Sequence, residues 1–159
     1  PVINDCKYFM ASQCHPTVFE GLPKERTYIW HTGAELVSDI LNKQDEHWWH
    51  IPGGSTVLLR AIPLFRMLGF KRFHLFGCDS CLDNEIHHAY EQTENDGDTV
   101  LPVNVGGEIF YCNPWMISQA QEFIDLIRAL GEEIELEIYG GLLQHILEMG
   151  ASYNDIKEI

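Results

Sequence analysis

Residues 52–95 read PGGSTVLLRAIPLFRMLGFKRFHLFGCDSCLDNEIHHAYEQTEN, and this stretch decides the fold. It begins with a glycine turn and continues as an apolar helix, which is expected to end at Gly69. A short apolar strand follows at 72–76, and a long polar loop begins at Gly77. A helix that leads into a strand, with polar residues released at the strand's carboxyl end, is the arrangement that forms ligand sites in open α/β sheets.

The sequence on either side continues this alternation of strands and helices. Strands are expected at 7–11, 26–30, 73–76 and 134–138. Helices are expected at 16–22, 33–42, 55–68, 114–130 and 142–149. A glycine-containing turn is expected to join 100–103 to 108–111 as a β-hairpin. The pattern predicts an α/β fold, a Rossmann-like three-layer sandwich whose mainly parallel sheet contains the four strands, with an antiparallel hairpin insertion.

Length and local signals add three expectations about the organisation of the chain. Its 159 residues predict a single domain. The first residue is Pro1 rather than Met, so we expect that an N-terminal segment is missing. Ser55 is the expected N-cap of its helix, and Pro63 is expected to kink or split that helix because proline removes a backbone hydrogen bond.

The composition excludes several classes of partner. A net charge of −14 argues against nucleic acid, which proteins bind through Lys and Arg. No apolar run approaches the roughly 18–20 residues of a membrane span, and no signal-peptide pattern is present. Five cysteines form an odd count without a disulfide framework, which favours a reducing compartment, the cytoplasm. The pair Cys78-x-x-Cys81 has no second pair of ligands, as a zinc motif would need. It also follows a strand, whereas a redox pair usually begins a helix. We therefore interpret these cysteines as two ordinary thiols.

Residues 53–56, Gly-Gly-Ser-Thr, stand at the expected start of a helix. Free backbone N–H groups and the positive end of the helix dipole suit an anion such as phosphate at this position. A tight turn with an N-cap is the alternative. The predicted ligand-binding residues here are Gly53, Gly54, Ser55 and Thr56. A weaker candidate of the same kind is Gly140-Gly141, before the last helix.

Polar residues also follow the strand at 72–76. Asp79 is expected at the carboxyl edge of the sheet, where a carboxylate can hold Mg²⁺ or a ribose hydroxyl. We predict Asp79 as a catalytic residue and metal ligand, and Gly77 and Ser80 as ligand contacts. The alternative is that Asp79 only caps a turn.

Histidines supply the remaining candidates. His87 and His88 are adjacent in the polar loop, and one of them is predicted to join Asp79 as a catalytic residue. His15 and His31 leave the first two strands and are predicted to contact the ligand; His15, followed by Pro16, has a helix-entry role as its alternative. Three tryptophans, Trp48, Trp49 and Trp115, are candidates for stacking on a base or sugar or for the core.

The combined pattern resembles the 6-hydroxymethylpterin diphosphokinase MptE-like domain, which motility-associated-factor glycosyltransferases share. In that family a GGS turn leads into an apolar helix, a Leu-Gly helix end, a hydrophobic strand, a G-x-D motif and a polar loop with a histidine. The matching residues are Gly53-Gly54-Ser55, Leu68-Gly69, 73–76, Gly77-Cys78-Asp79, and His87 or His88. The resemblance covers residues 50–90 closely and the remainder in outline. The family's G-P-S-L turn after the first strand has no counterpart here.

The resemblance implies a nucleotide-dependent transferase. The favoured form transfers a sugar from a nucleotide donor, because few Lys or Arg residues stand near the turns to offset the charge of ATP phosphates. A Mg²⁺-ATP-dependent diphosphokinase acting on a pterin-like alcohol is one alternative. A catalytically silent nucleotide- or sugar-binding or assembly domain is the other, and the absent G-P-S-L turn supports it. The expected partner is a small nucleotide or sugar ligand, and a homo-oligomer stays open.

Overall fold

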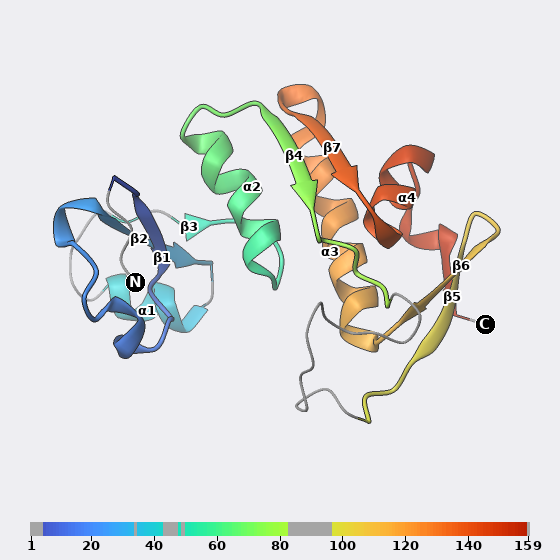
Figure 1. The fold of residues 1–159 in the computed structure, drawn as a ribbon, viewed down its shortest axis with the longest axis horizontal. Helices are drawn as coiled ribbons and strands as arrows, with labels where there is room; N and C mark the ends of the chain where they lie inside the picture. Colours follow the sequence, from blue (N-terminus) through green and yellow to red (C-terminus); the bar gives the residue numbers. More distant parts are fainter. Residues whose placement is uncertain (1–4, 34, 43–47, 49, 83–96, 159) are drawn as a thin grey trace. The chain divides into compact units, whose positions relative to one another are not determined.

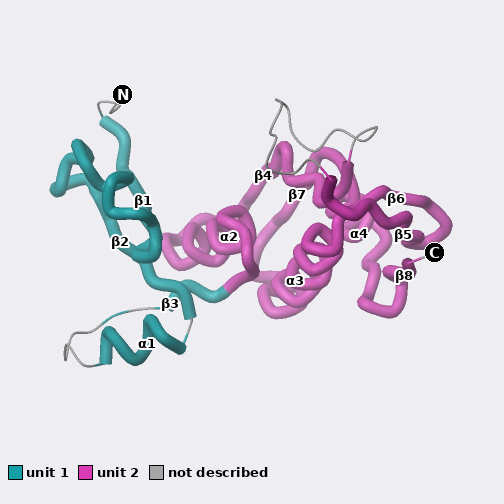
Figure 2. The backbone as a smooth tube through the Cα atoms, turned by 90° about the horizontal axis from the view of Figure 1, so that it is seen from below, with its two compact units in different colours: residues 1–52 teal, residues 53–159 magenta. Residues whose placement is uncertain are grey.

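A computed structural model describes residues 5–33, 35–42, 48, 50–82 and 97–158. The chain divides into two compact units, Pro1–Pro52 and Gly53–Ile159, which Figure 2 shows in different colours. Each unit is described by itself below. Together they contain parallel and antiparallel strands as well as helices, which makes the fold mixed α/β.

Unit 1 is built on three parallel strands in the order β1-β2-β3. The strands are β1 (Tyr8–Ala11), β2 (Thr27–Thr32) and β3 (His50–Ile51). The helical segments between them are η1 (Pro16–Phe19), η2 (Lys24–Arg26) and α1 (Glu35–Asn42). β1 and β2 pair from Tyr8↔Thr27 to Ala11↔Trp30, so their carboxyl ends lie at one edge of this sheet.

Unit 2 contains a parallel pair of strands and an antiparallel sheet (Figure 1). The parallel strands are β4 (Arg72–Phe76) and β7 (Glu135–Tyr139). The antiparallel sheet has the order β6-β5-β8 and is formed by β5 (Leu101–Val105), β6 (Glu108–Cys112) and β8 (Ile156–Glu158). The helical segments are α2 (Val57–Met67), α3 (Pro114–Leu130), η4 (Gly131–Glu133), α4 (Gly141–Met149) and η5 (Tyr153–Asp155).

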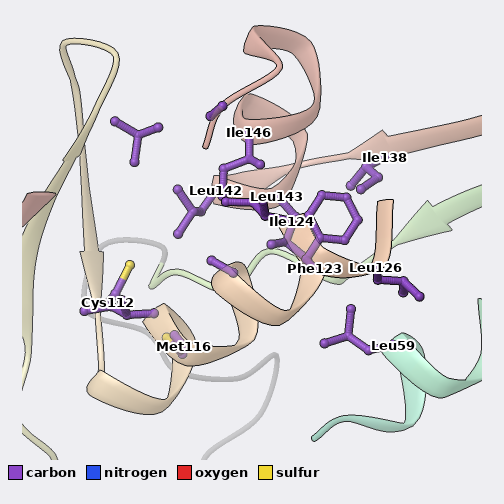
Figure 3. Packing of buried hydrophobic residues seen from close by; sticks show 14 of the residues in the cluster. Leu59, Cys112, Met116, Phe123, Ile124, Leu126, Ile138, Leu142, Leu143 and Ile146 are labelled. Carbon is purple, nitrogen blue, oxygen red and sulfur yellow. The ribbon is translucent and has the colours of Figure 1, made fainter. Parts of the chain in front are cut away.

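Helix α3 is the centre of the core of unit 2. Its apolar face carries Ala120, Phe123 and Ile124, none of which is exposed to solvent. These side chains belong to one cluster with Leu142 and Ile146 of α4. Figure 3 labels Phe123 and Ile124 beside these two α4 residues. Apolar residues spaced at helical intervals on both helices therefore share one buried core.

The sequence predictions for α2 need two corrections. Its N-cap is Thr56, whose side chain accepts a hydrogen bond from the Leu59 N–H at 3.2 Å. The predicted cap, Ser55, instead donates its hydroxyl to Glu122. Of the two predicted effects of Pro63, the split is wrong, because the helix runs unbroken from Val57 to Met67, and the kink stays a prediction. The Pro63 ring is buried, and this packing offsets the backbone hydrogen bond that proline cannot make.

The strand predictions are confirmed as strands but not as one sheet. β1 and β2 pair in parallel within unit 1, and β4 and β7 pair in parallel within unit 2, so the four strands are divided between two sheets. The hairpin of β5 and β6 is antiparallel, as predicted. It does not extend the parallel pair, because β5 pairs on its other side with β8, a short strand that the sequence analysis did not identify.

Among the described residues, no helix combines the length and apolar character that a membrane crossing requires.

Candidate functional site

A hollow of about 250 Å³ in unit 2 collects several of the predicted site residues. Three segments form most of its wall: the start of α2, the loop after β4, and the first turns of α3. The lining residues are Thr56, Leu58, Leu59, Gly77, Cys78, Asp79, Ser80, Cys81, Trp115, Met116, Gln119 and Leu143. Predicted residues that stand far apart in the sequence, Thr56 and Gly77–Ser80, thus lie on one surface.

The loop after β4 is held in an unusual backbone conformation. Gly77 has φ 69°, and Ser80 has φ 49°, a left-handed conformation that is uncommon for a residue with a side chain. Two contacts hold Ser80 there: its hydroxyl donates to Gln119 Oε1 at 3.4 Å, and its carbonyl accepts from the Cys112 thiol at 3.5 Å. A strained residue that its neighbours hold in place is characteristic of binding and catalytic loops.

Asp79 is fixed through its backbone, which leaves its side chain for the hollow. The Asp79 carbonyl accepts the N–H groups of Leu142 at 2.8 Å and Leu143 at 3.4 Å, at the start of α4. None of the hydrogen bonds among the described residues uses the Asp79 carboxylate. Among the described lining residues, Asp79 is the only charged one, and its carboxylate lies beside Gly140, near the positive end of α4.

Gly140 and Gly141 serve this contact with Asp79 rather than an anion. A Cβ on Gly141 would lie 2.5 Å from Asp79 Cα, so only glycine lets the two backbones approach. The Gly140 N–H donates to Gln144 Oε1 at 2.7 Å. The amides at this helix start are therefore engaged by the chain itself, and the weaker anion candidate at 140–141 has a structural explanation.

The turn at residues 53–56 holds an anion from its own chain. The Ser55 N–H and the Ser55 hydroxyl both donate to Glu122 Oε2, each at 2.8 Å. A Cβ on Gly54 would lie 2.5 Å from the same carboxylate oxygen, so Gly54 makes room for it. The sequence analysis did not identify Glu122 as a carboxylate that contacts this turn, and ligand contact by Gly53, Gly54, Ser55 and Thr56 stays a prediction.

The cysteines near the hollow are poor nucleophiles. Burial raises the pKa of the Cys78 thiol, and the negative charge of Asp79 raises it further. Burial, together with Cys81, raises the pKa of Cys112 to about 12. All five cysteines are free thiols. Because thiolates are the reactive form, these shifts agree with the interpretation of Cys78-x-x-Cys81 as ordinary thiols.

We predict that Cys112 resists alkylation in the native protein. A raised pKa keeps the thiol protonated throughout the range from pH 7 to 9, and the residue has no exposed surface. After incubation with a maleimide at pH 8, peptide mass spectrometry should find Cys112 unmodified. In denaturant all five cysteines should react, and rapid native modification of Cys112 would contradict the burial described here.

A metal ion at this site would need ligands beyond the described residues. Within that part of the chain, no group of three or more His, Cys, Asp or Glu side chains could hold a metal. Asp79 is the only carboxylate among the described residues that line the hollow. This donor set fits Mg²⁺, which commonly uses one or two carboxylates with water and substrate phosphates.

The predicted histidines are not brought together by the described residues. His15 lies in unit 1 and caps η1, where its Nδ1 accepts the Thr17 N–H at 3.4 Å, so its helix-entry role is confirmed. His31 lies on β2 of unit 1, and its buried Nδ1 has no partner among the described residues. His87, His88 and Trp49 lie outside the described residues. Ligand contacts by His15 and His31 stay predictions.

Sequence reasoning named Trp115 as a stacking or core candidate, but it missed Gln119 and Glu122 of the same helix, α3. The three residues stand at intervals of four and three, which places them on one side of the helix. Trp115 and Gln119 line the hollow, and Glu122 contacts Ser55. Polar residues at this spacing beside a buried apolar face were the signal that could have identified Gln119 and Glu122.

No protein-family model, curated protein or solved structure matches this chain. Its function is therefore argued from the geometry of the hollow and the chemistry of its lining.

Proposed function

We propose that the chain is a nucleotide-dependent transferase of the MptE-like type, and that the hollow lined by Thr56, Asp79 and Trp115 binds its nucleotide or nucleotide-sugar ligand. One observation carries the proposal: the start of α2, which directly follows the Gly53-Gly54-Ser55 turn of the family resemblance, lines one hollow together with the Gly77–Ser80 loop after β4. The turn itself is not among the described lining residues, whereas the G-x-D motif is. This meeting of a helix start with a strand's carboxyl end is typical of ligand sites in α/β proteins.

Each side chain has a role that its position supports. Asp79 offers a carboxylate for Mg²⁺ or for a ribose hydroxyl, and Ser80 and Gln119 offer hydrogen-bonding groups to a sugar. Trp115, which is 40% exposed, offers a face on which a base or sugar ring can stack. When bound, Mg²⁺ would offset phosphate charge. His87 or His88 remains the proposed acid or base.

The lining favours transfer of a sugar over transfer of a diphosphate. The described part of the lining contains no Lys or Arg, whereas diphosphate transfer from ATP builds charge on several oxygens that cations must stabilise. The hollow has a volume of about 250 Å³, just below the lower limit of roughly 300 Å³ for small-molecule sites. It can therefore hold part of a nucleotide sugar. The Mg²⁺-ATP-dependent diphosphokinase is the weaker form of the proposal.

The finer description of the fold belongs to the same proposal. A Rossmann-like three-layer sandwich is supported by parallel pairing within each unit and by the helices that connect the parallel strands. An experimental structure in which the parallel strands form one continuous sheet would establish it.

The contact between Glu122 and Ser55 favours a second candidate, a catalytically silent binding or assembly domain. A carboxylate of the chain already satisfies the Ser55 N–H, which a ligand phosphate would otherwise use. In a transferase, replacing Glu122 by Gln should strengthen nucleotide binding, because it removes a charge that competes with phosphate. In a silent assembly domain it should leave the response to nucleotides flat.

A thermal-shift panel tests the proposal. The ligands are CMP, UDP, ADP and ATP, each with and without Mg²⁺, and UDP-glucose represents the sugar donors. A ligand at 100 times its Kd stabilises the folded protein by about 2.7 kcal/mol, or roughly 5–10 °C for a chain of this size. We expect selective stabilisation that increases with Mg²⁺. A flat response across the panel would reject the transferase and leave the assembly domain.

A further inference from the structure

A second hollow of unit 2, of about 480 Å³, lies where the C-terminal ends of α3 and α4 meet the start of β7. Figure 1 shows α4 beside both α3 and β7, and these elements are in contact. The hollow shares no lining residue with the first one, which lies at the carboxyl end of β4. Its volume falls within the roughly 300–1,000 Å³ of small-molecule sites.

Most of the side chains that line this hollow are apolar. They are Ile127, Ile134, Leu136, Leu147 and Ala151. Two exposed glycines complete the described wall, Gly131 at the end of α3 and Gly150 at the end of α4. A Cβ on either glycine would meet no atom within 4 Å, so both stand at the open side of the hollow.

Of the described residues that line this hollow, Arg128 is the only charged one. The ion pairs of the described residues join Arg26, Arg66 and Arg72 to glutamates, and none of them includes Arg128. Its guanidinium lies over the Tyr153 ring, 5.6 Å from the centroid. Asp125, one turn earlier on α3, accepts a hydrogen bond from the Tyr153 hydroxyl. The guanidinium therefore has no carboxylate partner among the described residues.

We propose that this hollow binds a small amphipathic monoanion, a carboxylate with an apolar tail. The tail would pack against Ile134, Leu136 and Leu147, and the carboxylate would pair with the Arg128 guanidinium. The planar guanidinium matches a carboxylate with two parallel hydrogen bonds. Because the chain carries a net charge of −14, general attraction does not draw anions to it. Binding therefore requires both the apolar wall and the local cation, and it is independent of the proposed nucleotide site.

Octanoate is the probe, with 1-octanol as its uncharged counterpart. Titrations of the full chain, followed by isothermal calorimetry and ligand-detected NMR, should show that octanoate binds more tightly than 1-octanol. Arg128→Gln should raise the Kd for octanoate about tenfold, which is the effect of losing one charge-assisted hydrogen-bonded contact. It should leave the Kd for 1-octanol unchanged. Arg128→Lys keeps the charge without the planar geometry and should give an intermediate affinity.

Arg72→Gln is the matched control, since Arg72 is an exposed arginine of unit 2 that does not line the hollow. It should bind octanoate as the wild type does. Ala151→Leu narrows the hollow and should weaken both probes, with a thermal melt to confirm folding. The proposal fails if octanoate does not bind, if Arg128→Gln leaves its affinity unchanged, or if Arg72→Gln weakens it equally.

Discussion

Replacing Asp79 by Asn is expected to abolish stabilisation by nucleotide and Mg²⁺ while the unliganded protein unfolds at almost the same temperature. The structure gives the reason for this separation. The Asp79 backbone carbonyl, which an Asn retains, accepts the hydrogen bonds from Leu142 and Leu143 at the start of α4. The carboxylate is the only charged group that the described residues contribute to the lining of the hollow. The ligand would therefore lose its metal contact, and the fold would lose little.

Unfolding midpoints of wild type and variant, each with and without ligand, measure both effects. With ligand at 100 times its Kd, the free energy of unfolding of the wild type should rise by about 2.7 kcal/mol, and that of the variant should hardly change. Without ligand, the free energies of unfolding of the two proteins should agree within about 0.5 kcal/mol, as for a surface substitution. Glu132→Gln removes the same charge from an exposed position of η4 and should respond to ligand normally.

The opposite result would identify Asp79 as a structural residue. A variant that loses about 1 kcal/mol without ligand, as a lost helix or turn cap does, and still responds to nucleotide would place the ligand elsewhere. The four unfolding midpoints separate the two cases. A structural role of Asp79 would lower the midpoint of the variant without ligand. A binding role would instead remove the increase in midpoint that ligand causes in the wild type.

The sequence predicted local structure well because local structure depends on local signals. Short apolar and aromatic runs identified β1, β2, β4 and β7, and the predicted ends of α3 at residue 130 and of α4 at residue 149 are confirmed. It did not predict how the strands divide into sheets, since pairing depends on contacts between segments far apart in the chain. β8 was missed because three residues carry no readable alternation, and its pairing with β5 gives it its strand conformation.

The candidate site divides in the same way. The meeting of the α2 start with the loop after β4 followed from the rule that sites form at the carboxyl ends of parallel strands. The engagement of Ser55 by Glu122 could not be read from the sequence, because these residues stand 67 positions apart. The close approach of Gly141 to Asp79 is likewise a tertiary contact, and a glycine pair before a helix has the same local signature whether it binds a ligand or a neighbouring backbone.

Replacing Gly141 by Ala is expected to destabilise the protein by about 2–4 kcal/mol, the sum of a left-handed backbone cost and a steric clash. Gly141 has φ 65°, which costs a residue with a side chain about 1–2 kcal/mol. Its new Cβ would also lie 2.5 Å from Asp79 Cα and Cβ and 2.6 Å from the Asp79 carbonyl oxygen. Backbone atoms cannot rotate away, so the loop that carries Asp79 must move, and stabilisation by ligand should be lost as well.

Gly150→Ala, at the other end of α4, isolates the steric part of this cost. Gly150 has φ 61°, close to that of Gly141, but a Cβ there would meet no atom within 4 Å. It should therefore show only the backbone cost, about 1–2 kcal/mol, and keep its response to nucleotide. Urea unfolding followed by circular dichroism measures both variants. If the two substitutions lower the free energy of unfolding equally and both proteins still respond to nucleotide, the proposed role of the α4 start is wrong. Its contact with Asp79 would then not be what positions the Asp79 carboxylate in the hollow.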